Sequence, residues 1–271
     1  MLSKNQAPAC FHLHILSQGV MNMNKGTVLL GGNTPALSYA GQILAGSGFS
    51  VREQTGMDIQ YVLLDVPSFY TDGNLRSGRS LDTMLASVPG SVVICGGNLN
   101  NPKLDTYYTI DLLQDEVYLS ANAAITADCA IRVASQHLTT TLADSPALII
   151  GWGRIGKCLA QILRSMGCDV TIAARKNTDL AMLRALGYSA INISNIAGST
   201  SKYRLIYNTA PEKVLDVSSC RNCVKIDLAS RKGLVGEDVI WARGLPGMYA
   251  PETSGKLIAN TFMRLIKEVT E

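Results

Sequence analysis

Several features of membrane proteins and of nucleic-acid-binding proteins are missing from this sequence. No apolar run approaches the roughly 20 residues that a membrane-spanning helix requires. Charged residues make up only 17% of the chain, the net charge is +3, and there is no dense basic block. Such a block is the usual mark of a surface that binds nucleic acid. We therefore expect neither a membrane nor nucleic acid among the partners of this chain.

Metal-binding and disulfide patterns are also missing. The sequence has three His, and its seven Cys are scattered. Cys220 and Cys223 form a Cys-x-x-Cys, but no second pair or suitably spaced His accompanies it. We interpret this pair as a reduced surface turn rather than a zinc or redox site. Reduced cysteines fit a cytoplasmic protein, and no metal site is expected.

Residues 1–24 lack the pattern of a folded segment. They contain one Lys and no long apolar region, so they do not resemble a signal peptide. We expect a disordered leader, in which His12 and His14 are tail residues rather than metal ligands.

The rest of the chain alternates between strand and helix patterns. Residues 25–32 predict a strand that ends in a glycine turn, and residues 33–46 predict a helix. We expect residues 25–120 to form an N-terminal α/β domain. A helix over 121–142 is long enough to bridge two domains and begins a Rossmann domain over 121–251. A last helix over 252–271 is expected to pack back on the first domain. The predicted fold class is α/β with two domains, a C-terminal Rossmann doubly wound parallel sheet plus a smaller N-terminal α/β domain.

A dinucleotide-binding motif follows the apolar run 147–150. Gly151 is predicted to make the tight turn, Gly153 to let the backbone approach a pyrophosphate, and Gly156 to let helix and strand pack closely. The helix that follows offers free N–H groups and a partial positive charge to phosphates. A second strand over 170–173 completes the context that makes this motif specific.

The end of that second strand favours NADP(H) over NAD(H). An NAD site usually has Asp or Glu here to hold the ribose 2′-hydroxyl. The sequence has Arg175 and Lys176 instead, and Asp169 and Asp179 are poorly placed. The guanidinium of Arg175 matches a 2′-phosphate, with Lys176 as a second positive charge. The alternative is that both are solvated turn residues.

Two later strand ends are predicted to face the same cofactor, because ligands of an open parallel sheet bind beyond the carboxyl ends of its strands. Asn208 and Thr209 can bond the nicotinamide-side ribose, while Asp227 either contacts the cofactor or caps a turn. The predicted cofactor-binding residues are Gly151, Gly153, Arg154, Ile155, Gly156, Arg175, Lys176, Asn208, Thr209, Ala210, Pro211, Asp227 and Leu228.

The C-terminal half of the sequence resembles a known family. Residues 227–231 (DLASR) and 244–260 (GLPGMYAPETSGKLIAN) closely resemble the C-terminal signature of the A subunit of bacterial dipicolinate synthase. The glycine motif, Arg175 and the Asn-Thr-x-Pro run at 208–211 occur in the same order as in that family. Residues 122–128 resemble its interdomain segment, although Ile125, Asp128 and Cys129 replace its Pro, Glu and Gly. The resemblance is specific over 119–270 and looser over 25–118.

This resemblance implies an activity and partners. The implied reaction is the NADP-linked dehydrogenation of a cyclic lysine-pathway intermediate, of dihydrodipicolinate type, to dipicolinate. The substrate is then a small dicarboxylate, the expected partner is a flavoprotein-like B subunit, and a homo-oligomer is expected. The implied location is the cytoplasm of the mother cell of a spore-former.

A dicarboxylate substrate needs cationic or N–H donors beside the nicotinamide. The catalytic candidates are Thr126, Asp128 and Arg231, with Asp128 as a general base or a residue that orients one. The alternative for Asp128 is a helix-surface carboxylate. The candidates for substrate binding are Ser230, Pro246, Gly247 and Met248.

Two other functions fit the motifs. One is an NADP oxidoreductase of the shikimate or methylenetetrahydrofolate dehydrogenase type. Shikimate-type enzymes have a Lys–Asp pair in the first domain, for which Lys103 and Asp105 are not a convincing counterpart. The other is a non-catalytic NADP(H)-binding subunit, which the altered interdomain segment and the lack of an obvious acid–base pair favour.

Overall fold

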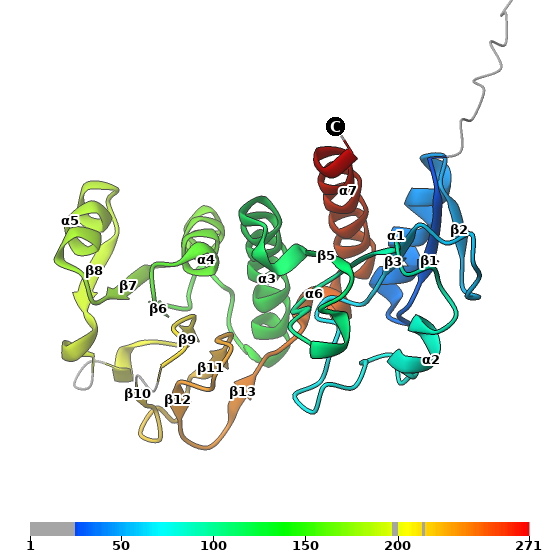
Figure 1. Ribbon diagram of the computed structural model, residues 1–271. Coiled ribbons are helices and arrows are strands. Elements are labelled where there is room, and N and C mark those ends of the chain that lie inside the picture. The colour runs from blue at the N-terminus through cyan, green and yellow to red at the C-terminus, as the bar shows by residue number, and fades with distance from the viewer. Residues whose placement is uncertain (1–24, 197–199, 213–214, 271) are drawn as a thin grey trace, which may run out of the picture.

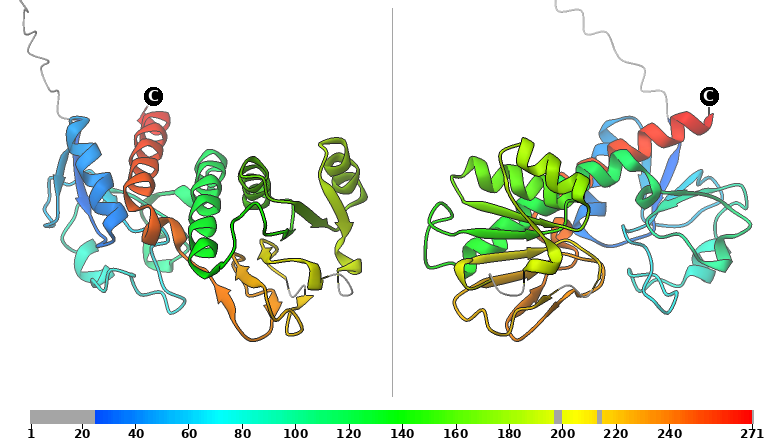
Figure 2. Two further views of the ribbon diagram at one scale, coloured as in Figure 1. Left: turned by 180° about the vertical axis from the view of Figure 1, so that it is seen from behind. Right: turned by 90° about the vertical axis from the view of Figure 1, so that its left-hand side faces the viewer.

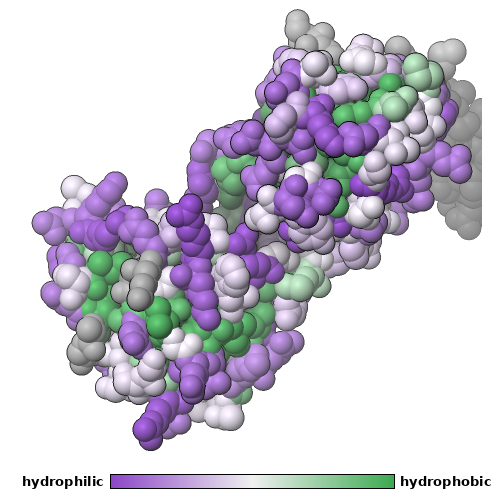
Figure 3. All heavy atoms as spheres, turned by 60° about the horizontal axis from the view of Figure 1, so that its bottom comes forward, coloured by the Kyte–Doolittle hydropathy of each residue, from purple (hydrophilic) through white to green (hydrophobic). Residues whose placement is uncertain are grey.

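Two large parallel sheets, a small two-stranded one and a shared row of helices make up the structure (Figure 1). It is a computed structural model that describes residues 25–196, 200–212 and 215–270. The predicted α/β class with a Rossmann sheet is confirmed. The predicted leader, residues 1–24, lies outside the described residues. Seen from below, the two halves form separate lobes that a narrower waist joins (Figure 3). No helix in the described part of the chain is long and apolar enough to cross a membrane.

The first sheet has five parallel strands and lies in the N-terminal half. Their spatial order is β2 (Ser50–Arg52), β1 (Thr27–Leu30), β3 (Tyr61–Leu63), β4 (Val93–Gly96) and β5 (Tyr108–Asp111). The connections contain α1 (Pro35–Gly46), α2 (Leu81–Leu85) and the 3-10 turns η1 (Pro102–Leu104) and η2 (Leu112–Gln114). Thr34 starts α1 because its hydroxyl accepts from the N–H of Leu37, and Pro35 fits the first helical position.

The second sheet has six parallel strands in the Rossmann order. They run β13 (Val239–Trp241), β11 (Val224–Asp227), β9 (Leu205–Asn208), β6 (Ala147–Ile150), β7 (Val170–Ala174) and β8 (Ser189–Asn192). All four residues of β6 are fully buried, which explains why that strand has an unbroken apolar sequence. From β6 the chain first adds β7 and β8 on one side and then returns to add β9 on the other side. Open sheets of this type bind ligands at the point where the strand order reverses in this way.

The two faces of this sheet are covered differently. On one face lie α4 (Arg154–Ser165) and α5 (Asn177–Ala185), beside the long connecting helix (Figure 1). Between β8 and β13 the described residues form no α-helix. The other face is covered by η3 (Ile193–Asn195), η4 (Thr200–Lys202) and the short pair β10 (Leu215–Asp216) and β12 (Leu234–Val235).

The connecting helix, α3, spans Glu116–His137 rather than the predicted 121–142. It begins earlier because the carboxylate of Asp115 accepts from the N–H of Tyr118 at 2.7 Å and so caps the helix. It ends earlier because Leu138 is extended, and residues 139–142 are not helical.

A row of helices joins the two halves. The last helix, α7 (Pro251–Thr270), packs against α1, and Figures 1 and 2 show α4, α3 and α7 side by side. A short helix, α6 (Leu245–Tyr249), contacts both α3 and α7. Phe262 of α7 lies edge-on to Phe49 and Tyr61, with ring centres 5.8 and 5.5 Å away. Arg264 donates to Asp115, the cap of α3, at 2.6 Å. The exact domain boundaries stay predictions.

The contact between α7 and α1 generates a stability prediction. A Cβ on Gly255 would lie 2.5 Å from the carbonyl oxygen of Ala36, so Gly255→Ala must push the two helices apart. We expect a loss of about 1–3 kcal/mol in the free energy of unfolding, measured by denaturant titration. Gly46→Ala is the control, because a Cβ there meets nothing within 4 Å. Equal stability of both variants would contradict the close packing of α7 on α1.

Candidate cofactor-binding site

The predicted cofactor residues gather at the carboxyl edge of the second sheet. Ile150 pairs with Ala173 on one side and with Asn208 on the other, and Asn208 pairs in turn with Asp227. The segments that follow these four strands therefore leave the sheet at the same edge. The glycine motif, Arg175, Thr209 and Leu228 all lie in these segments.

The glycine motif has the geometry that its three roles require. Gly151 has a φ of +105°, which favours glycine. A Cβ on Gly156 would lie 2.3 Å from the carbonyl oxygen of Gly151, so only glycine lets α4 approach β6. A Cβ on Gly153 would meet nothing within 4 Å, so the space in front of this residue is open. The turn is therefore tight against the protein on one side and open on the other.

The first turn of α4 is available to an anion. Gly153 is the N-cap, and no side chain caps this helix. Its first N–H groups therefore point to the open side of the glycine turn without a side-chain partner. Arg154 forms an ion pair with Glu116 of α3, while Ile155 is half-buried. Glu116 was not predicted from the sequence, because it is brought here only by the packing of α3 on α4.

Arg175 and Lys176 lie where β7 ends, and both are exposed. Nη1 of Arg175 is 2.8 Å from Oε2 of Glu212, which follows β9. Lys176 is the N-cap of α5 and makes no side-chain cap bond. The predicted phosphate-binding guanidinium thus already has a carboxylate partner, which the sequence did not reveal.

Asp227 and Asn208 form a buried network at the ends of β11 and β9. The carboxylate of Asp227 accepts from Nδ2 of Asn208 and from the N–H groups of Ala229, Gly233 and Leu234, at 2.7–3.0 Å. Both Asp227 and Asn208 are 0% exposed. The amide of Asn208 also bonds both backbone groups of Ala210. These side chains fix the loops at the edge of the sheet. Asp227 therefore has the turn-capping role that the sequence left open as an alternative to a cofactor contact.

The other predicted contacts in these loops differ in exposure. The hydroxyl of Thr209 donates to the carbonyl oxygen of Ile150 at 2.9 Å, which ties β9 to β6. Ala210 is half-buried and Pro211 is exposed. Leu228 is buried, and its N–H donates to the carbonyl oxygen of Asn208. The surface left for a ligand is therefore mainly that of Ala210 and Pro211.

The predicted catalytic residues lie on different elements. Thr126 faces inward on α3, and its hydroxyl donates to the carbonyl oxygen of Asn122 at 2.7 Å. Asp128 is exposed on the same helix, with its Oδ2 2.7 Å from Arg132. Arg132 also donates to the carbonyl oxygen of Tyr249 in α6. Arg132 was missed from the sequence, although its i, i+4 spacing from Asp128 was a usable signal.

The predicted substrate residues lie in the loop after β11 and in α6. Arg231 is exposed and has no ion-pair partner within the described ranges. The carbonyl oxygen of Ser230 accepts from Arg243. In α6, Pro246 is half-buried, whereas Gly247 and Met248 are exposed.

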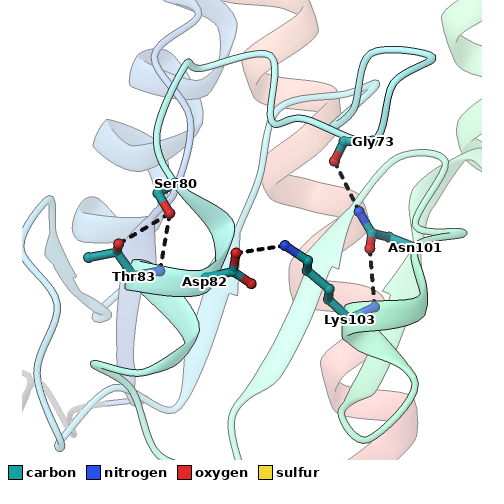
Figure 4. Close-up of polar contacts among 6 residues, drawn as sticks. All are labelled: Gly73, Ser80, Asp82, Thr83, Asn101 and Lys103. Atoms are coloured by element: carbon teal, nitrogen blue, oxygen red, sulfur yellow. Dashed lines mark hydrogen bonds and ion pairs between the residues drawn. The ribbon is translucent and has the colours of Figure 1, made fainter.

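The N-terminal half contains a Lys–Asp pair, but its Asp is not the one considered from the sequence. Nζ of Lys103 is 2.6 Å from Oδ2 of Asp82 in α2, and Figure 4 shows the two side chains pointing toward one another. Asn101 and Ser80 cap the short helices that carry them. The side chains are 53% and 70% exposed, as in an ordinary surface ion pair. Asp105 is not the partner of Lys103.

The two cysteines of the Cys-x-x-Cys are less exposed than the predicted surface turn implies. Cys220 is buried and Cys223 is half-buried, and neither is in a disulfide. Burial, with a smaller contribution from the neighbouring Cys220, raises the pKa of Cys223 to about 12. No group of three His, Cys, Asp or Glu side chains in the described segments is arranged to hold a metal ion.

The comparisons with known proteins agree with this geometry. No protein-family model matches the sequence. A transhydrogenase from Sinorhizobium meliloti has a similar structure, with a TM-score of 0.64, 12% identity, and coverage of 85% of this chain and 80% of its own. The chain therefore shares its fold with that transhydrogenase.

More specific similarity is to the A subunit of dipicolinate synthase. The structure of that protein from Bacillus halodurans has a TM-score of 0.77, with 22% identity over 89% of this chain and 98% of its own. The dipicolinate synthase A subunit of Bacillus subtilis strain 168 is 28% identical over 160 residues, 55% of this chain. That match spans about half of the relative's length, 54%. The resemblance predicted from the sequence is confirmed.

The network around Asp227 generates a second prediction. Asp227→Asn replaces an acceptor by an N–H₂ group that faces other N–H donors. We expect unfolding to become easier by about 3 kcal/mol, since a buried donor without an acceptor is costly. Asp238→Asn is the matched control, because Asp238 is exposed and Asn tolerates its φ of +59°. Equal unfolding midpoints for the two variants would contradict this role.

The raised pKa of Cys223 generates a third prediction. Because the thiolate is the reactive form, a thiol with a pKa of about 12 is almost entirely protonated at pH 8. We expect iodoacetamide to modify Cys223 in the folded protein at least tenfold more slowly than it modifies glutathione. Peptide mass spectrometry measures the rate, and unfolded protein is the control. Modification as fast as that of glutathione would contradict the buried environment.

Proposed function

We propose that this chain is a dipicolinate synthase A subunit, which catalyses the NADP-linked dehydrogenation of a cyclic dihydrodipicolinate-type intermediate to dipicolinate. The observation that carries the proposal is the open, uncapped glycine turn with Arg175 at the same sheet edge. The similarity to dipicolinate synthase A subunits supplies the substrate.

The described residues fit NADP at this edge. Gly153 and the first N–H groups of α4 would hold the pyrophosphate. Arg175 and Lys176 would bind the 2′-phosphate, because a guanidinium and an ammonium group match its charge. The Asp227 network would hold the loops after β9 and β11 in position beside the nicotinamide.

The reaction removes one hydride and one proton from the ring, and the product is aromatic. When bound, NADP supplies the hydride acceptor. Arg231 is an exposed cation beside the sheet edge and would bind a substrate carboxylate. Asp128 has Oδ2 bonded to Arg132, which leaves Oδ1 to take the proton. Because aromaticity favours the product, the main task of the protein is orientation.

The partners and location follow from the same proposal. A dipicolinate synthase A subunit works with a B subunit, and the cytoplasm of the mother cell is the expected location. Assembly into a homo-oligomer stays a prediction. A non-catalytic subunit is the second candidate, favoured by the exposed pairing of Asp128 with Arg132.

The direct test uses the purified chain, NADP⁺ and an enzymatically generated cyclic lysine-pathway intermediate, with and without a B subunit. Dipicolinate is followed through its luminescent lanthanide complex. We expect dipicolinate only when both the chain and NADP⁺ are present. If none forms in any combination while NADPH still binds, the substrate assignment is wrong and the non-catalytic role is favoured.

The same assay tests the role of Arg231. Arg231→Ala removes the cation that binds a carboxylate, so we expect KM for the substrate to rise roughly tenfold or more. Arg221→Ala is the matched control, because Arg221 is also exposed but precedes β11, at the opposite edge of the sheet. An unchanged KM for the Arg231 variant would exclude it from the substrate site.

A further inference from the structure

The ion pair between Arg175 and Glu212 lies across the carboxyl edge of the sheet. Arg175 follows β7 and Glu212 lies in the loop after β9, and β6 lies between these two strands. The pair therefore spans the end of β6, where the glycine turn begins. Any cofactor that reaches from this turn to the end of β7 passes beside it.

The backbone at Glu212 is held by the buried network. A Cβ on Gly233 would lie 2.3 Å from the carbonyl oxygen of Glu212, so these two segments are in close contact. The N–H of Gly233 donates in turn to Asp227 at 2.7 Å. Pro211 precedes Glu212 and restricts the backbone further. The carboxylate is thus presented from a supported loop, although its side chain is 63% exposed.

The two oxygens of Glu212 offer different chemistry. Oε2 is bonded to Arg175, whereas Oε1 has no hydrogen-bond partner among the residues described. A free carboxylate oxygen can accept from a ribose 2′-hydroxyl, as the acidic residue of an NAD site does. A 2′-phosphate instead needs the guanidinium of Arg175 and is repelled by the carboxylate.

We propose that Glu212 sets the cofactor preference of this site by competing with the 2′-phosphate of NADP(H) for Arg175. This inference rests on the proposed function. Bound NADP(H) replaces the carboxylate of Glu212 at Arg175. Bound NAD(H) leaves the ion pair in place and donates its 2′-hydroxyl to Oε1. The chain therefore discriminates less between the two cofactors than Arg175 and Lys176 alone would.

The test is Glu212→Gln, which keeps the size of the side chain and removes its charge. Kd values for NADPH and NADH are measured by the fluorescence of the reduced nicotinamide. We expect Kd for NADPH to fall roughly three- to tenfold, as removal of a competing exposed ion pair allows, and Kd for NADH to stay equal or rise. Glu237→Gln is the matched control, because Glu237 is exposed and precedes β13 at the other edge.

A second variant separates competition from a general effect. In the Arg175→Ala background, Glu212→Gln should improve NADPH binding clearly less than in the unaltered chain, because the contested guanidinium is gone and only the repulsion between the carboxylate and the 2′-phosphate is removed. An unchanged Kd for NADPH, or an equal improvement for both cofactors, would overturn the role of Glu212 and leave the proposed function intact. If the unaltered chain binds neither cofactor, both the proposed function and this inference are wrong.

Discussion

The carboxylate of Asp227 is the interaction on which the candidate site depends. It is fully buried at the end of β11, and its four donors come from Asn208, from the loop that follows β11 and from the first residue of β12. A buried carboxylate is stable only when its oxygens accept hydrogen bonds. Here one of those bonds, from Asn208, also joins the ends of two neighbouring strands. The loop after β9 rests on this arrangement through Gly233, so the positions of Pro211 and Glu212 follow from the same carboxylate.

The local parts of the site could be predicted from the sequence, and the contacts between distant segments could not. The glycine turn was predictable because Gly151 and Gly156 answer short-range steric demands that the flanking strand and helix reveal. Asn208 and Asp227 were predicted at the correct strand ends. Their position alone did not show that their polar atoms are already bonded to the protein. The start of α3 had a usable signal in Asp115 followed by Glu116, a capping pattern that the prediction did not include. Glu212 had no sequence signal, because its partner lies beyond an intervening strand.

In the proposed active site, the residues for the cofactor are held by more buried contacts than the residues for the substrate. The cofactor half combines steric constraints at Gly151 and Gly156 with an uncapped helix and a fixed pair of loops. The substrate half is built from exposed side chains on α3, on α6 and after β11, and Arg132 links the first two of these elements. The fold similarity to the dipicolinate synthase A subunit of Bacillus halodurans extends over 89% of this chain.

The packing of α7 on α1 has a consequence for the order of folding during synthesis. Ile258, Phe262 and Ile266 complete the core of the first sheet, yet they follow every strand of the second sheet in the chain. On the ribosome, the second sheet therefore has all its strands before the first sheet receives the helix that covers it. Domains usually fold from the N-terminal end onward as they emerge. In this chain the first half must wait, with the apolar faces of Phe49 and Tyr61 uncovered, until the last helix has left the exit tunnel. Nascent chains of this protein are therefore most exposed to chaperones and proteases at the first sheet.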